Sequence, residues 1–340
     1  MIAIHLNTGS FGNYWVEYCE KNNIQYKIVD CYSNDIIAKL SDCDALMWHH
    51  SHMNPKDILF AKQLLYSIEH SGKIVFPDFR TNWHFDDKLG QKYLFEALNC
   101  QAVKTYAFYK KEDALKWAES TTYPKVFKLR GGAGSWNVSL IKNKRNAIKI
   151  ISKAFGCGFK QYDAWSNINE RWRKFRLGKI NFSSLLMGYI RVFAEPYYSK
   201  VMGKERGYAY FQDFIPNNDS DIRVIVIDNK AFAIKRMVRE NDFRASGSGN
   251  ILYNKEFFDI KTIQLAFDLA DKIQGQSVAF DFVFDNEKPL IVEVSYGFSK
   301  EGYDDCEGYW DRDMNWYQGK FDFCGWMVET VIEKIKLNEK

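Results

Sequence analysis

Hydrophobic and polar positions alternate through the segment Ser277–Ser295, which reads SVAFDFVFDNEKPLIVEVS. A period of two is typical of β-strands, and it predicts a hairpin whose two strands are joined at residues 286–288. Symmetric pairing about the middle of that loop would place Asp281 opposite Glu293, with both carboxylates on one face. β-carbons in such a pair lie roughly 5 Å apart, a span that Mg²⁺ can bridge through oxygen ligands. The pattern therefore indicates a metal site with Ser295 as a third ligand, and a solvated strand face is the competing interpretation.

Strand and helix patterns alternate through the first 84 residues. The expected strands of a parallel sheet are Ile2–Leu6, Tyr26–Asp30, Ala45–Trp48 and Ile74–Phe76, and the expected helices are Trp15–Lys21 and Asp57–Ser71. Ligands favour the carboxyl ends of such strands. Ser10, His49 and His52 lie there as candidate substrate contacts, and loop residues satisfied by hydrogen bonds are the alternative. A zinc site is disfavoured, because no further histidine or cysteine lies nearby at suitable spacing.

A glycine-rich loop follows a short apolar strand in the segment PKVFKLRGGAGSWNVSL, residues 124–140. Glycine allows successive backbone N–H groups to point into one concavity, which suits a phosphate, and Lys128 would add a mobile charge. The candidate loop residues are Gly131, Gly132, Gly134 and Ser135. A plain turn between strands is the alternative, and the spacing matches neither the Walker loop nor the dinucleotide fingerprint.

Further cations occupy positions that suit an anionic ligand. Lys88 falls in the first turn of a helix for which Asp86 is the expected N-cap, where a cation is disfavoured unless an anion binds nearby; a surface lysine is the alternative. Two strands, Ile222–Ile227 and Ala231–Val238, are expected to flank a turn at residues 228–230. That turn would place Arg223 and Lys235 on one face. Arg236 and Arg244 follow closely, and a basic solvated face competes with phosphate binding.

From about Phe76 to Ser295 this order of elements resembles the ATP-grasp enzymes, a family that includes glutathione synthetase and D-alanine:D-alanine ligase. The resemblance implies an α/β (α+β) fold with ATP between a lid subdomain and a larger antiparallel-sheet subdomain. It implies ATP contacts from Lys88, Lys128, the glycine loop, the hinge residues Gln212, Asp213, Phe214 and Ile215, and the pair Asp221 and Arg223. It further implies catalytic roles for Lys235, Arg236 and Arg244, and metal ligation by Asp281 and Glu293.

Two positions depart from the family pattern. The third metal ligand is usually an asparagine, and here it is Ser295, whose hydroxyl is a poorer oxygen donor. The phosphate-loop lysine is usually followed by proline, and here Leu129 follows it. The implied reaction joins a carboxylate to an amine or a thiol through an acyl phosphate, with ATP and one or two Mg²⁺ ions, or Mn²⁺ in their place. A non-catalytic ATP-binding module and a phosphotransferase are the alternatives.

Composition fits an intracellular enzyme with small-molecule partners. The 340 residues are 46% hydrophobic and 26% charged, with a net charge of +4 and no concentrated basic tract, which argues against a nucleic-acid partner. Seven scattered cysteines without a CxxC pair indicate free thiols in a reducing compartment, and no apolar run is long enough to span a bilayer. We therefore expect a cytoplasmic protein.

The sequence predicts three parts: a Rossmann-like lobe at 1–84, a lid subdomain at 85–206, and a C-terminal subdomain with the metal site at 207–340. Residues 156–206 form the region least like the family, with a basic aromatic segment around Arg171–Arg176. We interpret it as a lid insertion that recognises a particular acceptor. An anionic membrane surface, another docking surface and a solvated helix are the alternatives.

Overall fold

The computed structural model describes residues 1–132, 137–160, 168, 171–172, 175–176, 178, 180–193, 197–239 and 242–338. The predicted loop residues Gly134 and Ser135 lie outside these ranges. The chain forms two compact units, one made of Met1–Val103 and Ile215–Lys340 and the other of Lys104–Phe214. The three-part division expected from the sequence stays a prediction.

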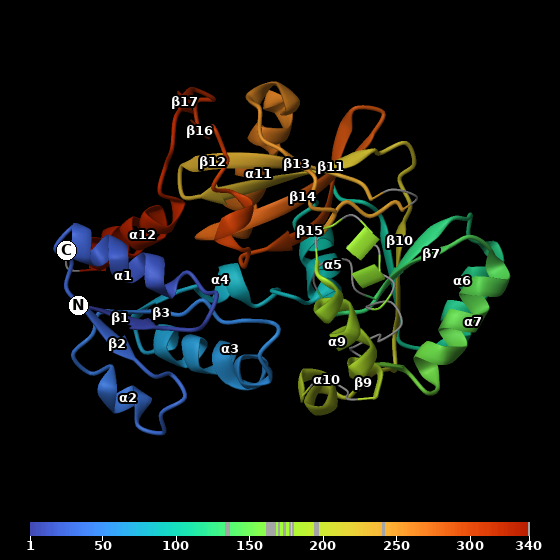
Figure 1. Ribbon diagram of the computed structural model, residues 1–340, viewed down its shortest axis with the longest axis horizontal. Coiled ribbons are helices and arrows are strands. Elements are labelled where there is room, and N and C mark those ends of the chain that lie inside the picture. The colour runs from blue at the N-terminus through green and yellow to red at the C-terminus, as the bar shows by residue number, and fades with distance from the viewer. Residues whose placement is uncertain are drawn as a thin grey trace. The chain divides into compact units, whose positions relative to one another are not determined.

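The first unit begins with the expected parallel sheet, in the order β2-β1-β3-β4 (Figure 1). Its strands are β1 (Ile2–His5), β2 (Tyr26–Val29), β3 (Ala45–Met47) and β4 (Ile74–Phe76). The helices are α1 (Gly12–Lys21), α2 (Ile36–Lys39), α3 (Pro55–His70) and α4 (Phe79–Asn82). Trp15 of α1 and Leu65 of α3 are fully buried in separate clusters with strand residues Ile4 and Leu46 respectively, so the two faces of the sheet are both covered. The predicted parallel α/β lobe is confirmed.

A larger antiparallel sheet in the same unit has the order β15-β14-β11-β12-β16-β17, with β13 paired to β12. Its strands are β11 (Ser220–Ile227), β12 (Lys230–Met237), β13 (Ile251–Leu252), β14 (Ser277–Asp285), β15 (Lys288–Ser295), β16 (Gly308–Asp311) and β17 (Trp316–Gln318). Short 3₁₀ turns lie at Lys255–Phe257 and Lys300–Gly302. Helix α11 (Ile260–Ile273) packs on the face of Val224 and Phe280, and α12 (Phe323–Asn338) packs with α1 on the face of Ile225 and Phe232.

The hairpin of β14 and β15 pairs Asp281 with Glu293, which confirms the predicted register. The predicted three-residue loop is wrong, because Asp285 pairs with Lys288 across a two-residue turn. Asn286 and Glu287 both have positive φ, +48° and +68°, as a type I′ turn requires. A β-bulge beside Asp281 restores the register that the shorter turn would have shifted.

The hairpin of β11 and β12 has no such compensation. Its turn is also two residues long, since Ile227 pairs with Lys230, and Arg223 therefore lies opposite Ile234. Lys235 lies opposite Ile222 on the other face. The predicted shared face of Arg223 and Lys235 is wrong, because one residue fewer in the turn moves every side chain of the second strand to the opposite face.

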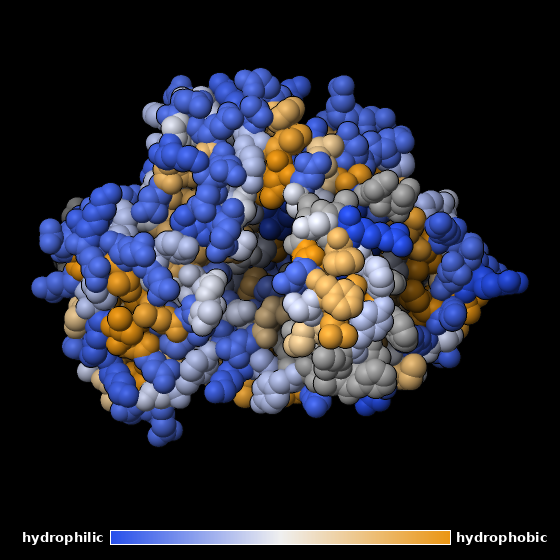
Figure 2. All heavy atoms as spheres, in the orientation of Figure 1, coloured by the Kyte–Doolittle hydropathy of each residue, from blue (hydrophilic) through white to orange (hydrophobic). Residues whose placement is uncertain are grey.

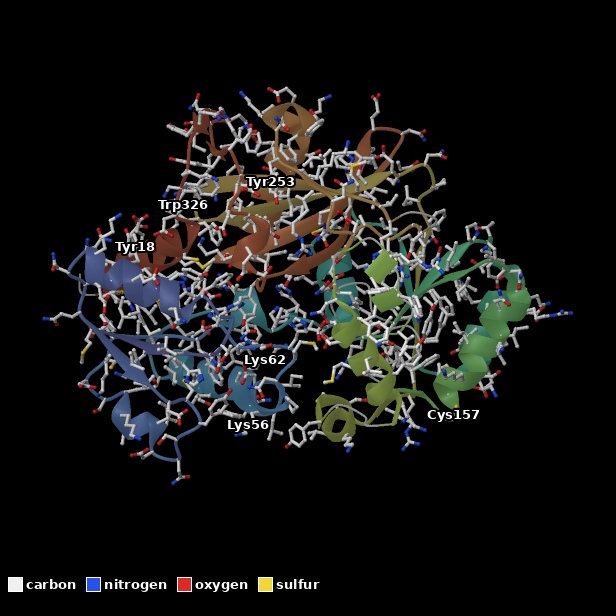
Figure 3. All side chains as sticks on the ribbon, in the orientation of Figure 1. Tyr18, Lys56, Lys62, Cys157, Tyr253 and Trp326 are labelled. Atoms are coloured by element: carbon white, nitrogen blue, oxygen red, sulfur yellow. The ribbon has the colours of Figure 1, made fainter. Side chains whose placement is uncertain are left out.

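The chain that follows α4 leads to α5 (Lys88–Ala97), in which Lys88 is the first residue. The expected N-cap Asp86 is wrong by one residue: Asp87 caps the helix, accepting from Gly90 N, and Asp86 has a φ of +52°. Lys62 of α3 donates to the carbonyls of Trp83 (2.9 Å) and Phe85 (3.1 Å), which ties this segment to the first sheet (Figure 3).

The second unit contains a four-stranded sheet in the order β5-β10-β6-β7. These strands are β5 (Thr105–Phe108), β6 (Lys125–Lys128), β7 (Val138–Ile141) and β10 (Ala209–Asp213). Helices α6 (Lys111–Ser120) and α7 (Lys144–Phe155) pack on the face of Phe127 and Phe211. The unit also contains β8 (Phe159–Lys160), α9 (Phe182–Phe193), α10 (Tyr197–Met202) and β9 (Lys204–Glu205). Hydrophobic side chains gather on the visible surface over α9 (Figure 2).

The sequence also predicts free cysteine thiols and no membrane-spanning segment. All seven cysteines are free thiols. Among the residues that the structure describes, no helix is both long and apolar enough to cross a lipid bilayer.

Candidate functional site

A row of charged residues crosses three neighbouring strands of the large sheet. Glu293 of β15 lies opposite Asp281 of β14, which in turn lies opposite Arg223 of β11. One step along, Asp221 of β11 lies opposite Arg236 of β12. Cross-strand neighbours share a face, so the row continues the face on which Ile225 and Ala279 pack against α1 and α12.

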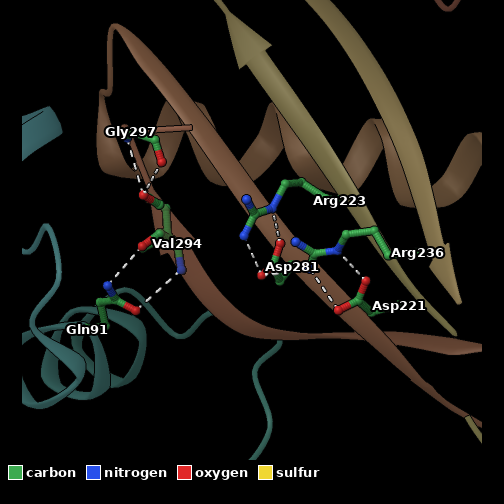
Figure 4. Close-up of polar contacts among 8 residues, drawn as sticks. Gln91, Asp221, Arg223, Arg236, Asp281, Val294 and Gly297 are labelled. Atoms are coloured by element: carbon green, nitrogen blue, oxygen red, sulfur yellow. Dashed lines mark hydrogen bonds and ion pairs between the residues drawn. The ribbon is translucent and has the colours of Figure 1, made fainter. Parts of the chain in front are cut away.

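The positive charge next to Asp281 comes from two arginines (Figure 4). Arg223 makes a bidentate pair, with Nε 2.5 Å from Oδ1 and Nη2 2.7 Å from Oδ2. Arg236 Nη2 lies 3.0 Å from the same Oδ2, and Arg236 also forms a bidentate pair with Asp221, at 2.7 Å for both contacts. Two acids and two arginines thus form a closed, formally neutral quartet. Bidentate guanidinium pairs fix orientation as well as charge, so Asp281 is held in one geometry.

Burial and charge act in opposite directions on the acids of this quartet. Burial raises the pKa of Asp281, but the guanidinium groups of Arg223 and Arg236 more than offset it and hold that pKa far below its usual range. Burial also raises the pKa of Asp221, and there the pairing with Arg236 does not fully offset the burial. Asp281 is therefore ionised at every physiological pH.

Lys88 faces the other acid of the row, with its Nζ 3.2 Å from Glu293 Oε1. Burial lowers the pKa of Lys88, but the carboxylates of Glu293 and Asp86 outweigh it and leave the pKa raised, so the lysine is charged. Glu293 keeps 28% of its side chain exposed, whereas Lys88 keeps 6%. A ligand can therefore reach the carboxylate of Glu293 while the ammonium group stays in place.

The candidate third ligand, Ser295, makes two local hydrogen bonds. Its Oγ donates to the carbonyl of Gly297 (2.9 Å) and accepts from Gly297 N (3.2 Å). One lone pair of the hydroxyl remains for another partner. Within the described ranges, no group of three or more His, Cys, Asp and Glu side chains converges as in a dedicated metal site.

The candidate substrate residues lie near the chain that leaves β15. His49 stacks on Phe11 with ring centroids 4.0 Å apart and accepts a hydrogen bond from Phe11 N at Nδ1 (3.1 Å). A β-carbon at Gly297 would lie 3.1 Å from the Phe85 ring and 3.3 Å from His49 Nε2, so a larger residue there would require these neighbours to shift. Burial and two neighbouring histidines lower the pKa of His49 to about 3, which keeps the ring neutral.

The other two candidates of this lobe have structural contacts. Ser10 Oγ accepts from Asn7 N (3.3 Å) and Gly12 N (3.1 Å), so it organises the turn before α1. His52 packs edge-on against Phe85, with ring centroids 5.6 Å apart. Roles for these residues in substrate binding stay predictions.

The second unit brings two of the candidate ATP contacts together on one face. Lys128 and Gln212 are both buried, and Lys128 Nζ donates to Gln212 Oε1 at 2.7 Å. This face of the sheet is opposite the one that α6 and α7 cover, as the strand registers show. The predicted strand, loop and strand order around Lys128 is confirmed, and Gly132 has a φ of +114° in the loop.

The hinge residues span the end of β10 and the boundary between the units. Asp213 accepts a hydrogen bond from Lys125 Nζ (2.6 Å), and Asp213 N donates to the carbonyl of Lys104 (2.9 Å). Phe214 and Ile215 follow directly and are half-buried. The main-chain bond between Asp213 and Lys104 joins the two ends of the second unit.

Comparison with known proteins identifies the fold. The family model for RimK-like ATP-grasp domains matches residues 198–308, the stretch that contains the hinge and the charged row. D-cycloserine synthetase DcsG is similar over 98% of this chain and 99% of its own, with a TM-score of 0.61 and 10% identity. The chain has the ATP-grasp fold.

Two other solved structures agree. The D-alanine–D-alanine ligase of Bacillus anthracis complexed with ATP has a TM-score of 0.56 at 10% identity, covering 99% of this chain and 97% of that one. The biotin carboxylase domain of Hydrogenobacter thermophilus 2-oxoglutarate carboxylase, in complex with MgADP and bicarbonate, has a TM-score of 0.60 at 12% identity, covering 97% and 69%. Among curated proteins the sequence has no match.

Within this ATP-grasp fold the three candidate catalytic cations lie in different surroundings. Arg236 belongs to the quartet. Lys235 points to the α11 face, where its Nζ lies 5.5 Å from the centre of the Phe257 ring. Arg244 lies in the loop after β12 and pairs with Asp242, with Nε 2.8 Å from Oδ2. Of the three, Arg236 is paired with acids of the sheet, Asp221 and Asp281.

Sequence reasoning missed two contributors to this region. Gln91 bonds both main-chain groups of Val294, beside Glu293. Its spacing of three and four residues from Lys88 and Phe95, on one face of the helix, was a usable signal. Tyr303 is buried and interacts with Arg223. No sequence signal distinguishes it from the other 19 tyrosines.

Proposed function

We propose that the chain is an ATP-dependent ligase that joins a carboxylate to an amine, or to a thiol, through an acyl phosphate. The observation that carries the proposal is the fixed row of Glu293, Asp281 and Arg223, with Lys88 against its outer end. Two neighbouring carboxylates with cations on either side, on one sheet face, match what a metal-bound triphosphate and an acyl phosphate need. The ATP-grasp fold supplies the context, and proteins of similar fold are a D-alanine–D-alanine ligase and a D-cycloserine synthetase.

The residues of the row fit one magnesium ion. Asp281 Oδ2 accepts from both arginines and Oδ1 from one, so Oδ1 keeps a lone pair directed elsewhere. Glu293 is partly exposed, and Ser295 retains one acceptor position. Asp281 and Glu293 would hold the ion, with Ser295 as a weaker third ligand. When bound, Mg²⁺ would neutralise charge on the phosphates of ATP.

Each unit has cations that are candidate phosphate contacts. In the first unit Lys88 and Arg236 are charged and buried, so their field is weakly screened. In the second unit Lys128, with Gly131 and Gly132, would hold the phosphates. The hinge residues Gln212 to Ile215, the last of which belongs to the first unit, would hold the adenine through main-chain groups. Arg244 would help to stabilise the acyl intermediate, on the condition that it leaves Asp242.

The proposed reaction needs no nucleophilic side chain from the protein. A substrate carboxylate oxygen bonds to the γ-phosphorus of ATP as the bond to ADP breaks, and the amine nitrogen then bonds to the acyl carbon as phosphate leaves with its oxygen. The amine proton passes to solvent or a nearby base. Charged side chains fixed by ion pairs stabilise the developing negative charge without reorganising. The substrate pair that we favour is an amino acid with a sugar acid or another small acid, because aromatic residues, which are 16% of the chain, suit stacking on a sugar.

The test is a product analysis with pooled substrates. The full chain is incubated with ATP, Mg²⁺ and pools of amino acids and of sugar acids, and phosphate release is recorded for each combination. The expected result is phosphate release that requires one acid and one amine together, with an amide product in the mass spectrum. Asp281→Asn should abolish this turnover, whereas Asp285→Asn at the exposed end of the same strand should not.

Two results would contradict the proposal. Tight ATP binding without turnover in any pool would indicate a non-catalytic ATP-binding module. A phosphorylated product without an amide would indicate a phosphotransferase.

A further inference from the structure

Helix α9 of the second unit has apolar residues on its exposed side as well as on its buried side. Leu185 and Gly188 are buried, while Phe182, Leu186 and Tyr189 are exposed and follow one another at intervals of four and three residues, as one stripe of a helix does. An apolar stripe along a helix normally packs against a partner. The outward stripe of α9 lacks a cover in the part of the chain that the structure describes, since these three side chains are 65%, 51% and 40% exposed.

The inward side of α9 is held in place, so the exposure is not that of a loose helix. Arg171 donates to the carbonyl of Ser184, and a β-carbon at Gly188 would lie only 2.6 Å from Arg171 Cδ. On the outward side, Trp172 Nε1 donates to Tyr189 Oη at 2.6 Å, which fixes one residue of the stripe. The outward stripe is therefore presented on a fixed support.

Exposed apolar side chains concentrate in this part of the molecule (Figure 2). Of the 18 large hydrophobic residues that are exposed among those described, seven fall between positions 172 and 201. Single exposed hydrophobics are ordinary, but a concentration of this kind marks an interaction surface. We call the following residues the α9–α10 surface: Phe182, Leu186, Met187, Tyr189, Tyr197 and Val201.

The positive charge of residues 160–206 indicates an anionic partner. Residues 160–206 contain ten Lys and Arg but four Asp and Glu, so the segment carries +6 while the remainder of the chain carries −2. Arg176, Lys200, Lys204 and Arg206 are exposed among the described residues. An apolar stripe with aromatic residues, flanked by exposed cations, has the composition of a helix that lies in the interface of an anionic bilayer.

We propose that the α9–α10 surface binds an anionic lipid membrane, with the apolar stripe inserted at the headgroup level and the flanking cations over the headgroups. Each basic residue near such a surface contributes about 1 kcal/mol at moderate ionic strength. Membrane binding of this kind is reversible and needs no spanning helix. The inference is independent of the reaction that the chain catalyses.

The experiment is flotation of the full chain with vesicles. Vesicles of phosphatidylcholine are compared with vesicles that also contain phosphatidylglycerol, at low and at high salt. The chain should float with the anionic vesicles at low salt and much less at high salt or with phosphatidylcholine alone. The double variant Leu186→Ser, Met187→Ser should lower the partition coefficient about tenfold or more.

Matched variants separate the contribution of the basic residues to membrane binding from that of the apolar stripe. Lys200→Gln with Lys204→Gln should lower binding to anionic vesicles by roughly 30-fold at low salt. Leu59→Ser, at a side chain that is 76% exposed on α3, should leave binding unchanged. Thermal melting of each variant checks the fold, because these side chains are exposed and their replacement should not shift the transition.

Three results would overturn the proposal. The first is absence of flotation with anionic vesicles, and the second is equal flotation of the Leu186→Ser, Met187→Ser variant. The third is a dimer in sedimentation velocity that the same variant dissociates, since this would assign the surface to a second copy of the chain.

Discussion

Gln91 in α5 pairs with Val294 in the edge strand β15 as a neighbouring strand would. Its Nε2 donates to the carbonyl of Val294 at 2.8 Å, and its Oε1 accepts from the main-chain N–H of Val294 at 3.3 Å. Lys88 lies one helical turn before Gln91, and Glu293 directly precedes Val294. One side-chain amide therefore fixes the distance between the lysine and the carboxylate of the candidate site.

Replacing Gln91 by leucine should lower both stability and activity. Two buried main-chain groups of Val294 would lose their partners, at a cost of about 2 kcal/mol or more in the free energy of unfolding. Phosphate release should fall roughly 10- to 100-fold, because α5 would no longer hold Lys88 in register with Glu293. Urea unfolding and the phosphate assay measure the two effects.

The control is Glu96→Gln on the exposed side of α5. It breaks only the surface pair with Lys92, which contributes less than about 1 kcal/mol. Equal activity of Gln91→Leu and Glu96→Gln would contradict the positioning role.

Arg236, and not its neighbour Lys235, should be required for turnover. Arg236→Lys keeps the charge but loses the planar pairing with Asp221, so activity should fall at least about tenfold while the protein stays folded. Lys235→Met should keep activity within about twofold, because the ammonium group contacts Phe257 on the α11 face and contributes under about 1 kcal/mol there. Loss of activity in a well-folded Lys235→Met variant would contradict this prediction. It would show that Lys235 is needed for turnover although it lies on the face of β12 opposite Arg236.

The two hairpins explain how far the sequence could predict this site. Alternation predicted each strand, and in both hairpins the loop was expected to be one residue too long. In β14 and β15 the bulge cancels that error, so the pairing of Asp281 with Glu293 is confirmed. In β11 and β12 nothing cancels it, and the predicted face of Lys235 is wrong. Turn length and bulges depend on local backbone conformation, which alternation of side chains does not encode.

Ion pairs were harder to predict than strands. The sequence indicated a cation between Asp281 and Glu293, and the structure supplies Arg223 and Arg236 beside the first and Lys88 beside the second. Arg223 reaches Asp281 because β11 is the strand next to β14, a pairing between segments some 60 residues apart. The alternation of side chains within one strand does not show which distant strand lies beside it, or in which register the two pair.

Binding of divalent metal should depend on ATP. Asp221, Arg223, Arg236, Asp281, Lys88 and Glu293 sum to zero formal charge, so the row offers little attraction to a bare dication. A triphosphate would supply the missing negative charge. We expect Mn²⁺, followed by electron paramagnetic resonance, to bind at least about tenfold more tightly with ATP present than without it. Chelation with EDTA should abolish turnover.

Asp281→Asn serves as the comparison for this coupling. The variant should lose most of the ATP-dependent tightening, because one of two carboxylates becomes a neutral amide. Tight Mn²⁺ binding to the free protein, with no effect of ATP, would contradict the charge argument.

Two buried histidines should make the protein less stable in weak acid. Burial lowers the pKa of His50 to about 3 and that of His84 to about 4, from an ordinary value of 6.5. The unfolded chain therefore binds more protons than the folded one below about pH 6.5, so the stability that these groups contribute is complete above that pH and is lost as the pH falls toward the folded pKa values. Between about pH 7.5 and 5, His84 alone should cost about 2 kcal/mol. Urea unfolding at pH 7.5 and at pH 5 gives the loss of stability for the wild type and for His84→Leu. The difference between the two losses is the contribution of His84, because both proteins contain the same carboxylates. An equal loss of stability in the two proteins would show that His84 is protonated in the folded state.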